Sequence, residues 1–382
     1  RAMSEQSERP PKNICLMGST GSIGRQAIDV ITGSRNFRIV SMSAHSNTSL
    51  FTKQIKKIKP ETACITNSEA FKKYGRTTAG PTKIFPPEKL SALCSDKKID
   101  IVLAGSSGSS ALIPILDALS KGKTVAIANK EPIVMAGDIL CAAAKKHGGK
   151  ILPVDSEHSA VFQCIENSKA PAEKIYITAS GGAILSAGRK KISPEFILAH
   201  PVWKMGKKIT VDSSTGMNKG LEVIEAHHLF AMDFSKIKVL LHPKALIHGM
   251  VEFADGSVSA YLSAPDMRIP ISYALNYPQK MKMRNFMDFS NMNLTLEKYP
   301  AEKFICFKLA LEAGKKGGLY PASLVGANET AVSTFLAKRI PFARIAHIIK
   351  KTLSETPDMR YNIPNVLRIE KWAKEYAEKL IK

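Results

Sequence analysis

The sequence predicts an α/β protein with a Rossmann-like domain at the N-terminus, a central α/β domain, and a helical bundle at the C-terminus. Short apolar runs alternate with helical patterns over the first 155 residues, and a glycine-rich turn follows the first run. From residue 304 onward, apolar residues recur at helical spacing to the end of the chain.

The length of 382 residues exceeds that of one ordinary core, so several domains are expected. We place their boundaries where the pattern of the sequence changes. The expected parts are a dinucleotide-binding domain at 12–155, a central domain at 156–285 with a loop-rich flap at 195–207, a linker at 286–303, and a helical domain at 304–382.

The chain carries 55 Lys and Arg against 33 Asp and Glu, a formal charge of +22. Such an excess is compatible with nucleic acid, a membrane surface or an acidic ligand as partner. The basic residues are dispersed, however, and only 7% of residues are aromatic, without the clustering typical of nucleic-acid binders. We therefore expect a solvated surface and no nucleic-acid partner; retention on DNA at physiological salt would favour the alternative.

Cysteine usage and hydropathy indicate a cytoplasmic protein. No Cys-x-x-Cys pair points to zinc or redox chemistry, and the widely spaced thiols are expected to stay reduced. No run approaches 18 apolar residues, so no membrane association is expected. The first eleven residues lack the apolar core of a signal peptide.

The first predicted strand, residues 13–17, leads into a turn at 18–24 that reads Gly-Ser-Thr-Gly-Ser-Ile-Gly, and a helical pattern continues to Ile31. Glycines in such a turn permit close approach of the backbone to a pyrophosphate, and the helix N-terminus supplies unpaired N–H groups. Because the turn lies between the first strand and a helix, we interpret it as dinucleotide-binding.

The second predicted strand, residues 37–42, ends where the adenosine ribose of a dinucleotide would lie. NAD-specific sites place an acidic residue there, whereas this chain reads Ser43-Ala44-His45-Ser46-Asn47. The sequence therefore favours NADP, and His45, Ser46 and Asn47 are the candidates at this end of the cofactor.

Further strands are predicted at 63–66, 99–103 and 124–128, with helices between them. The last of these strands ends at Asn129-Lys130-Glu131. Polar residues just past the carboxyl end of a parallel strand lie where α/β sheets bind ligands, so we favour a functional role over a solvated turn.

Three acidic residues are candidate metal ligands. An apolar strand at 150–154 runs into Asp155-Ser156-Glu157, and an extended segment would place both carboxylates on one side. A helix at 218–230 supplies Glu222, three residues before Glu225. Three carboxylates beside hydroxyl, amide and ammonium groups indicate a hard divalent cation and an anionic substrate.

The remaining pattern predicts a strand at 174–178 followed by a compact Ser-Gly-Gly loop, and antiparallel strands at 239–241, 245–253 and 257–262. The loop-rich stretch 186–208 reads either as a mobile flap or as a surface loop anchored by Trp203. Glu225 and His228 form a Glu-x-x-His pair without a second copy, and we interpret the histidines as structural. Helices are expected at 304–314, 322–337, 341–354 and 364–382.

Taken together, these stretches resemble the 1-deoxy-D-xylulose 5-phosphate reductoisomerase family from about residue 12 to about residue 350. The resemblance rests on the glycine-rich turn at 18–24, Ala128-Asn129-Lys130-Glu131, Val154-Asp155-Ser156-Glu157-His158, Ser180-Gly181-Gly182, His200-Pro201-x-Trp203-x-Met205-Gly206, Asp212-Ser213, Asn218-Lys219-Gly220-Leu221-Glu222 and Pro265-Asp266-Met267-Arg268.

The resemblance implies roles for these residues. Asp155, Glu157 and Glu222 would bind Mg²⁺, Mn²⁺ or Co²⁺. The phosphate of the sugar substrate would be held by Ser180, Ser213, Asn218 and Lys219. Its remainder would meet Lys130, Ser156, His200, Trp203, Met205 and Met267. The NADPH site would be lined by Gly18, Thr20, Gly21, Ser22, Ile23, Gly24, His45, Ser46, Asn47, Asn129, Glu131 and Gly206.

The family implies an NADPH-dependent rearrangement and reduction of a ketose phosphate in isoprenoid biosynthesis, carried out by a homodimer with a dimerisation sheet in the central domain. Lys130, Glu157, His200 and Glu222 would be the catalytic residues. The chain departs from the family at His45-Ser46, where Gly and a basic residue are usual, at Gly216, and at Ala245.

A plain NADP-dependent sugar-phosphate or semialdehyde dehydrogenase is the nearer alternative. A semialdehyde enzyme with a covalent intermediate needs a nucleophilic Cys, and Cys164 is a poor candidate because it lies in an apolar helix.

Overall fold

The computed structural model describes residues 10–75, 80–186, 192–199, 206–282, 287–288, 290 and 292–382. The described chain divides into two compact units. The first comprises the described residues up to Asn129, Ala142–Val154 and Met267–Met281; the second comprises Lys130–Cys141, Asp155–Asp266 and the described residues from Lys282 to Lys382.

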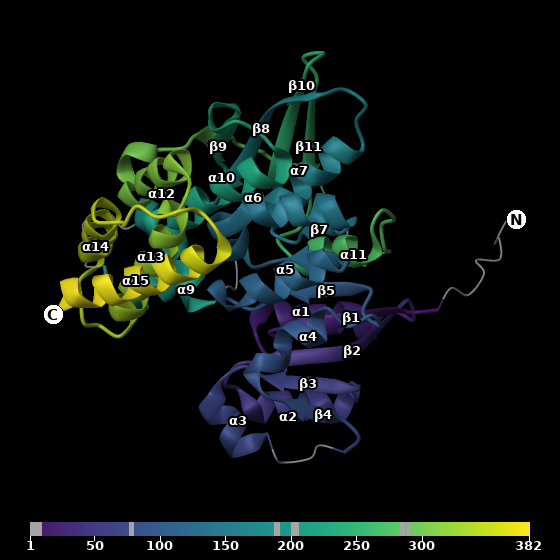
Figure 1. Ribbon diagram of the computed structural model, residues 1–382. Helices are drawn as coiled ribbons and strands as arrows, with labels where there is room; N and C mark the ends of the chain where they lie inside the picture. The colour runs from purple at the N-terminus through teal and green to yellow at the C-terminus, as the bar shows by residue number, and fades with distance from the viewer. Residues whose placement is uncertain are drawn as a thin grey trace, which may run out of the picture. The chain divides into compact units, whose positions relative to one another are not determined.

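The first unit is built on a seven-stranded parallel sheet with the order β4-β3-β2-β1-β5-β6-β7 (Figure 1). Its strands are β1 (Lys12–Met17), β2 (Phe37–Ala44), β3 (Thr62–Ile65), β4 (Lys83–Phe85), β5 (Ile101–Ala104), β6 (Thr124–Ile127) and β7 (Lys150–Pro153). The chain order reverses at β1, between β2 and β5, which is where open parallel sheets bind nucleotides. The predicted Rossmann-like fold is confirmed.

All but the last of the described helices of this unit connect successive strands of the sheet, as parallel pairing requires. They are α1 (Ser22–Thr32), α2 (Thr48–Ile58), α3 (Ser68–Tyr74), α4 (Leu90–Cys94), α5 (Leu112–Ser120), the C-terminal part of α6 (Lys130–His147) and α11 (Arg268–Asn276). In α1, buried Gly24, Ala27, Ile28 and Ile31 fall at helical spacing and form one apolar face.

The second unit combines a mixed five-stranded sheet, order β11-β10-β8-β9-β12, with a group of helices (Figure 1). The strands are β8 (Ala172–Ala179), β9 (Ile237–Leu241), β10 (Ile247–Phe253), β11 (Val258–Leu262) and β12 (Glu297–Lys298). β10 pairs antiparallel with β11, as expected, and also with β8. β9, expected in the antiparallel portion, instead runs parallel to β8. The parallel pairing is possible because a long helical connection between β8 and β9 returns the chain to the same end of the sheet.

The helices of the second unit are the N-terminal part of α6, α7 (Ser156–Glu166), α8 (Pro194–Leu198), α9 (Lys207–Thr215), α10 (Met217–Phe230), α12 (Ile305–Lys316), α13 (Tyr320–Leu336), α14 (Phe342–Ser354) and α15 (Ile363–Ile381). The apolar core beside the sheet includes Val161, Ile175, Ile177, Val223 and Phe304. Helix α13 packs against α14 and α15, which confirms the helical C-terminal region.

The unit bounds differ from the predicted domain bounds in three ways. Residues 130–141 belong to the second unit although they lie inside the predicted 12–155 domain, and Met267–Met281 belong to the first. The helices after residue 304 join the second unit instead of forming a third. The expected linker at 286–303 contains β12, which pairs with β9. Backbone pairing across a long sequence separation leaves no local pattern, which is why the linker prediction missed this strand.

Candidate functional site

Three carboxylates from two helices converge in the second unit. Asp155, Glu157 and Glu222 each offer an oxygen within 4.8 Å of the others. Asp155 is the N-cap of α7, where it accepts a hydrogen bond from the Glu157 backbone N–H at 3.3 Å. Glu157 lies in the first turn of α7 and Glu222 on α10. The expected extended Asp155-Ser156-Glu157 segment is therefore wrong, because the strand ends at Pro153; the carboxylates meet because the helix begins at Ser156.

Lys130 bridges two of the three carboxylates. Its Nζ lies 2.8 Å from Asp155 Oδ2 and 3.0 Å from Glu222 Oε1, and it donates to Asn218 Oδ1 at 2.8 Å. Burial alone lowers the pKa of Lys130, but Asp155 and Glu222 outweigh burial and raise it well above its usual value. The side chain is therefore protonated at neutral pH in this arrangement.

Lys219 neutralises the other side of the cluster. Its Nζ donates to Glu157 Oε1 at 2.7 Å, to Glu222 Oε2, and to the backbone carbonyl of Thr178 at the end of β8. Only 5% of this residue is exposed. Glu222 therefore accepts from both lysines, while Asp155 and Glu157 accept from one lysine each.

Two further titratable groups lie behind these ligands. His158 is fully buried; its Nε2 lies 2.8 Å from the backbone oxygen of Glu222, and its Nδ1 lies 3.3 Å from Asp155 Oδ1 and 3.7 Å from Glu225 Oε2. It thus ties α7 to α10 at the two ligand positions. Sequence reasoning gave neither His158 nor Glu225 a role; the His at i+3 from the N-cap Asp155 was the available signal.

The pKa values in the cluster follow from burial and charge. Burial, aided by Glu222, raises the pKa of Glu157 to about 7. Burial also raises the pKa of Glu225 to about 7. Burial lowers the pKa of His158, but Glu225 and Asp155 outweigh it and raise the value to about 9. Four carboxylates thus face three basic groups in this buried cluster, and two of the carboxylates, Glu157 and Glu225, titrate near neutral pH.

The donor set fits a divalent cation. Three carboxylates supply hard oxygen ligands of the kind Mg²⁺ and Mn²⁺ prefer, and their atoms already lie close enough to share one ion. The ligand atoms of a second group also lie within 4.8 Å of one another; this group consists of Asp155, His158 and Glu225. Its histidine, however, already contacts the backbone carbonyl of Glu222. We therefore identify Asp155, Glu157 and Glu222 as the better candidate.

The other predicted substrate residues of the second unit lie on the elements around the carboxylates. Asn218 contacts Glu222 Oε1 through its side-chain nitrogen, and Ser156 Oγ donates to Glu157 Oε2. Ser213 lies on α9, and a Cβ at Gly182 would fall 2.9 Å from its backbone oxygen, so the turn after β8 packs on this helix. Ser180 opens that turn and is partly exposed.

A separate ionic network joins α6, α9 and α13. Lys208 Nζ lies 2.8 Å from Glu131 Oε1 and 2.8 Å from Asp212 Oδ2, and Asn328 donates to Asp212 Oδ1 at 2.9 Å. Asp212 and Asn328 are each 1% exposed. Burial raises the pKa of Glu131, but Lys208 outweighs it and the net shift is downward. The network fixes Glu131, beside Lys130, and Asp212, beside Ser213; sequence reasoning missed Lys208 and Asn328.

The first unit presents the glycine-rich turn as expected. Gly18 has φ +74°, and a Cβ there would lie 2.7 Å from the Ser106 backbone nitrogen. At Gly24 a Cβ would lie 2.2 Å from the Gly18 oxygen. The N-cap of α1, Gly21, makes no side-chain capping bond, which leaves the first N–H groups of the helix to a ligand. Thr20, Ser22 and Ile23 are partly exposed beside this turn. Its geometry fits a dinucleotide pyrophosphate.

The candidates at the adenosine end are exposed residues that follow β2. His45 Nδ1 lies 3.1 Å from Thr66 Oγ1, and Asn47 caps α2 by accepting from the Leu50 N–H at 3.2 Å. Ser46 lies between them. Asn129, 3% exposed, donates to the Gly108 carbonyl at 2.8 Å and braces the loop after β5.

The structure does not place several of the predicted substrate and cofactor residues beside the carboxylate cluster or the glycine-rich turn. His200, Trp203 and Met205, with the rest of residues 200–205 of the expected flap at 195–207, lie outside the described residues. Gly206 is exposed and precedes α9, while Met267 belongs to the first unit and precedes α11. Their assigned roles remain predictions.

Comparison with known proteins gives one consistent result. Family profiles described as 1-deoxy-D-xylulose 5-phosphate reductoisomerase, its C-terminal domain, and DXP reductoisomerase C-terminal domain match residues 14–137, 151–230 and 262–376, respectively. The 1-deoxy-D-xylulose 5-phosphate reductoisomerase of Clostridium botulinum (strain Loch Maree) is 42% identical over 96% of this chain and 99% of its own. That of Clostridium kluyveri is 43% identical over 96% and 98%.

Solved structures agree with the sequence matches. A Zymomonas mobilis 1-deoxy-D-xylulose 5-phosphate reductoisomerase in complex with NADPH superposes with a TM-score of 0.87, at 36% identity, over 97% of this chain and 99% of that chain. A DOX-P reductoisomerase in complex with NADPH, fosmidomycin and magnesium gives a TM-score of 0.89 at 34% identity, over 97% and 98%.

Proposed function

The chain belongs to the 1-deoxy-D-xylulose 5-phosphate reductoisomerase family, and on this premise we propose which of its side chains perform the family's reaction. It is an NADP-dependent oxidoreductase of isoprenoid biosynthesis. It converts 1-deoxy-D-xylulose 5-phosphate to 2-C-methyl-D-erythritol 4-phosphate with NADPH and a divalent metal ion. The observation that carries our assignment is the convergence of Asp155, Glu157 and Glu222.

Asp155, Glu157 and Glu222 would hold the divalent ion. When bound, that ion acts as a Lewis acid toward the substrate oxygens, and NADPH supplies hydride to the rearranged aldehyde. His158 holds Asp155 and the backbone of Glu222 in a fixed relation, so the ligands need little reorganisation. Loss of a ligand carboxylate therefore removes catalysis without disturbing the sheet of the first unit.

Lys130 is the candidate for proton handling and for contact with the sugar backbone. Its ammonium carries three donors at the carboxylate cluster, where alkoxide charge would develop on the substrate. Ser156 is held by Glu157 at the first turn of α7, in reach of the same cluster. Glu157 has a pKa of about 7, which suits proton transfer, although its ligand role reduces that basicity.

The phosphate of the substrate would be held by Lys219, Asn218, Ser180 and Ser213. Lys219 supports this assignment because its ammonium reaches the backbone at the end of β8, two residues before Ser180. His200, Trp203, Met205 and Met267 would close over the rest of the substrate. Binding energy from the remote phosphate would then be used to orient the reacting carbons.

We assign the cofactor to the glycine-rich turn of the first unit. Gly18, Gly21 and Gly24 would approach the pyrophosphate, with Thr20, Ser22 and Ile23 beside them. The exposed residues His45, Ser46 and Asn47 would meet the adenosine end, and Asn129, Glu131 and Gly206 the nicotinamide half. The missing acidic residue after β2 supports NADP over NAD.

A homodimer and a cytoplasmic location complete the proposal. Among the described strands, β11 lies at the edge of its sheet with β10 as its one neighbour, and Val258 on it is 56% exposed, which supports pairing of this sheet with a second copy. Among the described helices, none combines the length and the apolar character needed to cross a membrane. All six cysteines are free thiols.

Light scattering of the wild type and of Val258→Lys tests the dimer. A wild-type protein that is monomeric at micromolar concentration would contradict it.

The activity is tested by NADPH oxidation with 1-deoxy-D-xylulose 5-phosphate, with and without a chelator, and by NMR identification of the product. We expect metal-dependent oxidation and the branched product. Reduction without rearrangement would instead support the plain dehydrogenase alternative.

A further inference from the structure

Lys219 has no hydrogen-bonding capacity left for a substrate phosphate in the arrangement described. An ammonium carries three N–H donors. Those of Lys219 meet Glu157, Glu222 and the Thr178 carbonyl, and the residue is 5% exposed. A phosphate can gain a donor from Lys219 only if one of these acceptors gives it up.

Lys130 is saturated in the same way. Its donors meet Asp155, Glu222 and Asn218 at 2.8 to 3.0 Å. As a result, each carboxylate of the candidate metal site already accepts from a lysine. The two ammonium groups supply two positive charges to this cluster, the same charge that one divalent ion would supply.

A divalent ion and both ammonium groups cannot share these carboxylates without strong repulsion. Like charges a few ångström apart in a buried region repel by several kcal/mol, even with an effective dielectric constant near 20. The three carboxylates that would bind the metal are also those that hold the lysines. Metal binding must therefore loosen at least one lysine.

We propose that Lys130 and Lys219 are internal counter-cations that exchange with the metal ion, and that this exchange releases Lys219 to bind the substrate phosphate. The inference rests on the proposed function of the site. It implies that the metal and the phosphate bind cooperatively through Lys219. The protein would then discriminate against binding the sugar phosphate before its metal is in place.

The position of Lys219 explains why it, and not Lys130, is the lysine that would meet phosphate. Its Nζ contacts the carbonyl of Thr178, and the chain turns two residues later through Ser180 and Gly182. That turn packs on the backbone of Ser213. Lys130 instead contacts Asp155 at the N-terminus of α7 and the Asn218 side chain on α10, and no contact with the backbone at the end of β8 is among its described bonds.

The first test uses the wild-type protein and inorganic phosphate as probe. Calorimetric titration with saturating Mg²⁺ should give tighter phosphate binding than titration in a chelator, by a factor of about 5 to 150, the usual range for two coupled sites. Lys219→Met should bind phosphate weakly under both conditions. Equal phosphate affinities of the wild type with and without Mg²⁺ would overturn the proposal.

The second test measures Mn²⁺ affinity from the free-ion signal in electron paramagnetic resonance, without phosphate. Lys219→Met removes a competitor for Glu157 and Glu222, so Mn²⁺ should bind at least about fivefold tighter than in the wild type. Lys208→Met is the matched control. It removes an equal charge from a lysine that holds two other carboxylates, Glu131 and Asp212, and should leave Mn²⁺ affinity unchanged. Unchanged or weaker Mn²⁺ binding in Lys219→Met would contradict the exchange.

Asp155→Asn separates this inference from the proposed function. If Asp155→Asn binds Mn²⁺ as tightly as the wild type, the metal-site assignment itself fails. If Asp155→Asn loses Mn²⁺ while Lys219→Met does not gain affinity, the assignment stands and only the exchange of lysine for metal is wrong. The wild-type phosphate titration decides the question should Lys219→Met not fold.

Discussion

At the scale of single residues, Asp155 combines two duties. It caps α7 and is one of the three candidate metal ligands. Its pKa is subject to burial, which raises it, and to Lys130, which lowers it; the net value is well below the usual range. The carboxylate is therefore ionised at any pH at which the protein is studied, as a metal ligand must be.

Replacing this ligand should stop turnover and leave cofactor binding intact. Asp155→Asn keeps the shape and the capping oxygen but loses the charge, and a metal's stabilisation of several kcal/mol corresponds to a loss of about 10³-fold in kcat. Glu222→Gln should behave alike. NADPH fluorescence measures the cofactor affinity. A folded Asp155→Asn variant that no longer binds NADPH would show that this acid serves the nucleotide and not the metal.

His248 gives the protein a predictable acid sensitivity. It is 3% exposed and contacts Ser263, and burial lowers its pKa to about 4. The unfolded chain takes up this proton below pH 6.5, whereas the folded chain does not until about pH 4. Stability is therefore present above pH 6.5 and is lost as pH falls toward 4, by about 2 kcal/mol between pH 7 and pH 5.

Urea unfolding of the wild type and of His248→Gln at these two pH values measures this contribution. The variant should lose about 2 kcal/mol less than the wild type between pH 7 and pH 5. Identical losses in both proteins would show that His248 is protonated in the folded state.

At the scale of elements, the predicted strands and helices were found wherever an apolar pattern ran for several residues. The chain around Asp155 shows where such reasoning fails. A period of two predicted an extended segment through Glu157, yet Asp followed by Glu ahead of an apolar helix is equally an N-terminal helix signal. The competing signal prevailed because β7 ends at Pro153. Contacts such as His158 with the Glu222 carbonyl depend on two helices meeting, which no local pattern encodes.

The network between α6, α9 and α13 should contribute to stability through Lys208. Lys208→Met would leave Glu131 and Asp212 buried without their cation, at a cost of about 3 kcal/mol. Lys174→Met, which breaks an exposed pair with Glu252, should cost much less. Denaturant titration compares the two; equal costs would show that the α6–α9 contact is not structural.

The turn before α1 should not tolerate a side chain at Gly24. A Cβ there would lie 2.2 Å from the Gly18 oxygen, so Gly24→Ala must displace the turn that we assign to the pyrophosphate. We expect NADPH to bind at least about tenfold more weakly. Gly33→Ala, at the other end of α1 with φ −79°, controls for the helix itself. Unchanged NADPH affinity in Gly24→Ala would remove this turn from the cofactor site.

At the scale of the whole molecule, the sequence predicted the fold class and the chemistry better than the domain bounds. Helix α6 is shared by both units, with Lys130–Cys141 in one and Ala142 onward in the other, and a non-helical residue, Ala136, interrupts it. Helix α11 returns to the first unit after more than a hundred residues in the second. A linear reading assumes that each domain is one continuous segment, so it could not find such exchanges.

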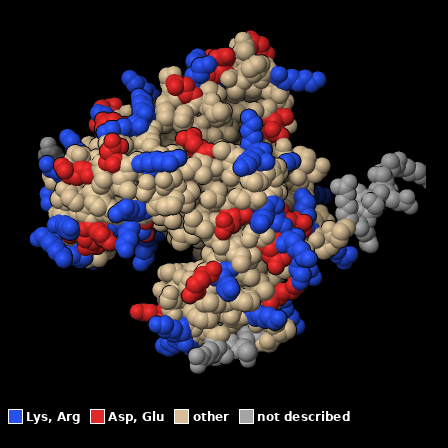
Figure 2. Space-filling model, viewed as in Figure 1, with Lys and Arg blue, Asp and Glu red and all other residues tan. Residues whose placement is uncertain are grey.

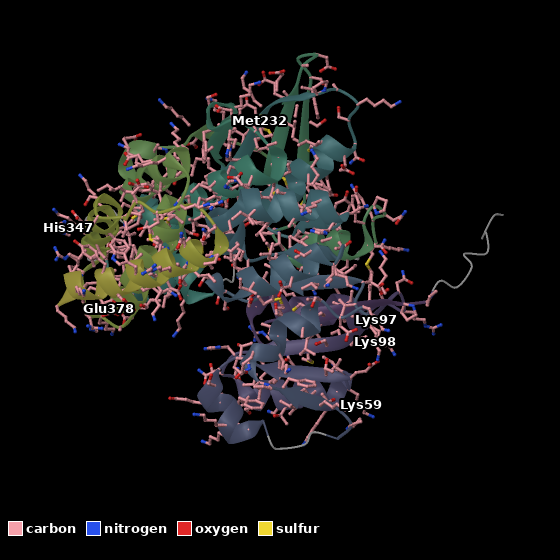
Figure 3. All side chains as sticks on the ribbon, viewed as in Figure 1. Lys59, Lys97, Lys98, Met232, His347 and Glu378 are labelled. Atoms are coloured by element: carbon pink, nitrogen blue, oxygen red, sulfur yellow. The ribbon has the colours of Figure 1, made fainter. Side chains whose placement is uncertain are left out.

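On the face shown in Figure 2, Lys and Arg alternate with Asp and Glu instead of forming one continuous stripe. In the first unit, Lys59, Lys97 and Lys98 are exposed (Figure 3), and Lys98 is paired with Glu61 at 3.0 Å. This distribution supports the solvated surface expected from the composition.

We infer above all that Asp155, Glu157 and Glu222 share one divalent ion. An anomalous difference map from crystals grown with Mn²⁺ tests it most directly. We predict one strong peak at about 2.0 to 2.6 Å from an oxygen of each carboxylate, with at least one of Lys130 and Lys219 withdrawn from them. A peak held by other side chains, or these three carboxylates still bound only by the two lysines, would contradict the account.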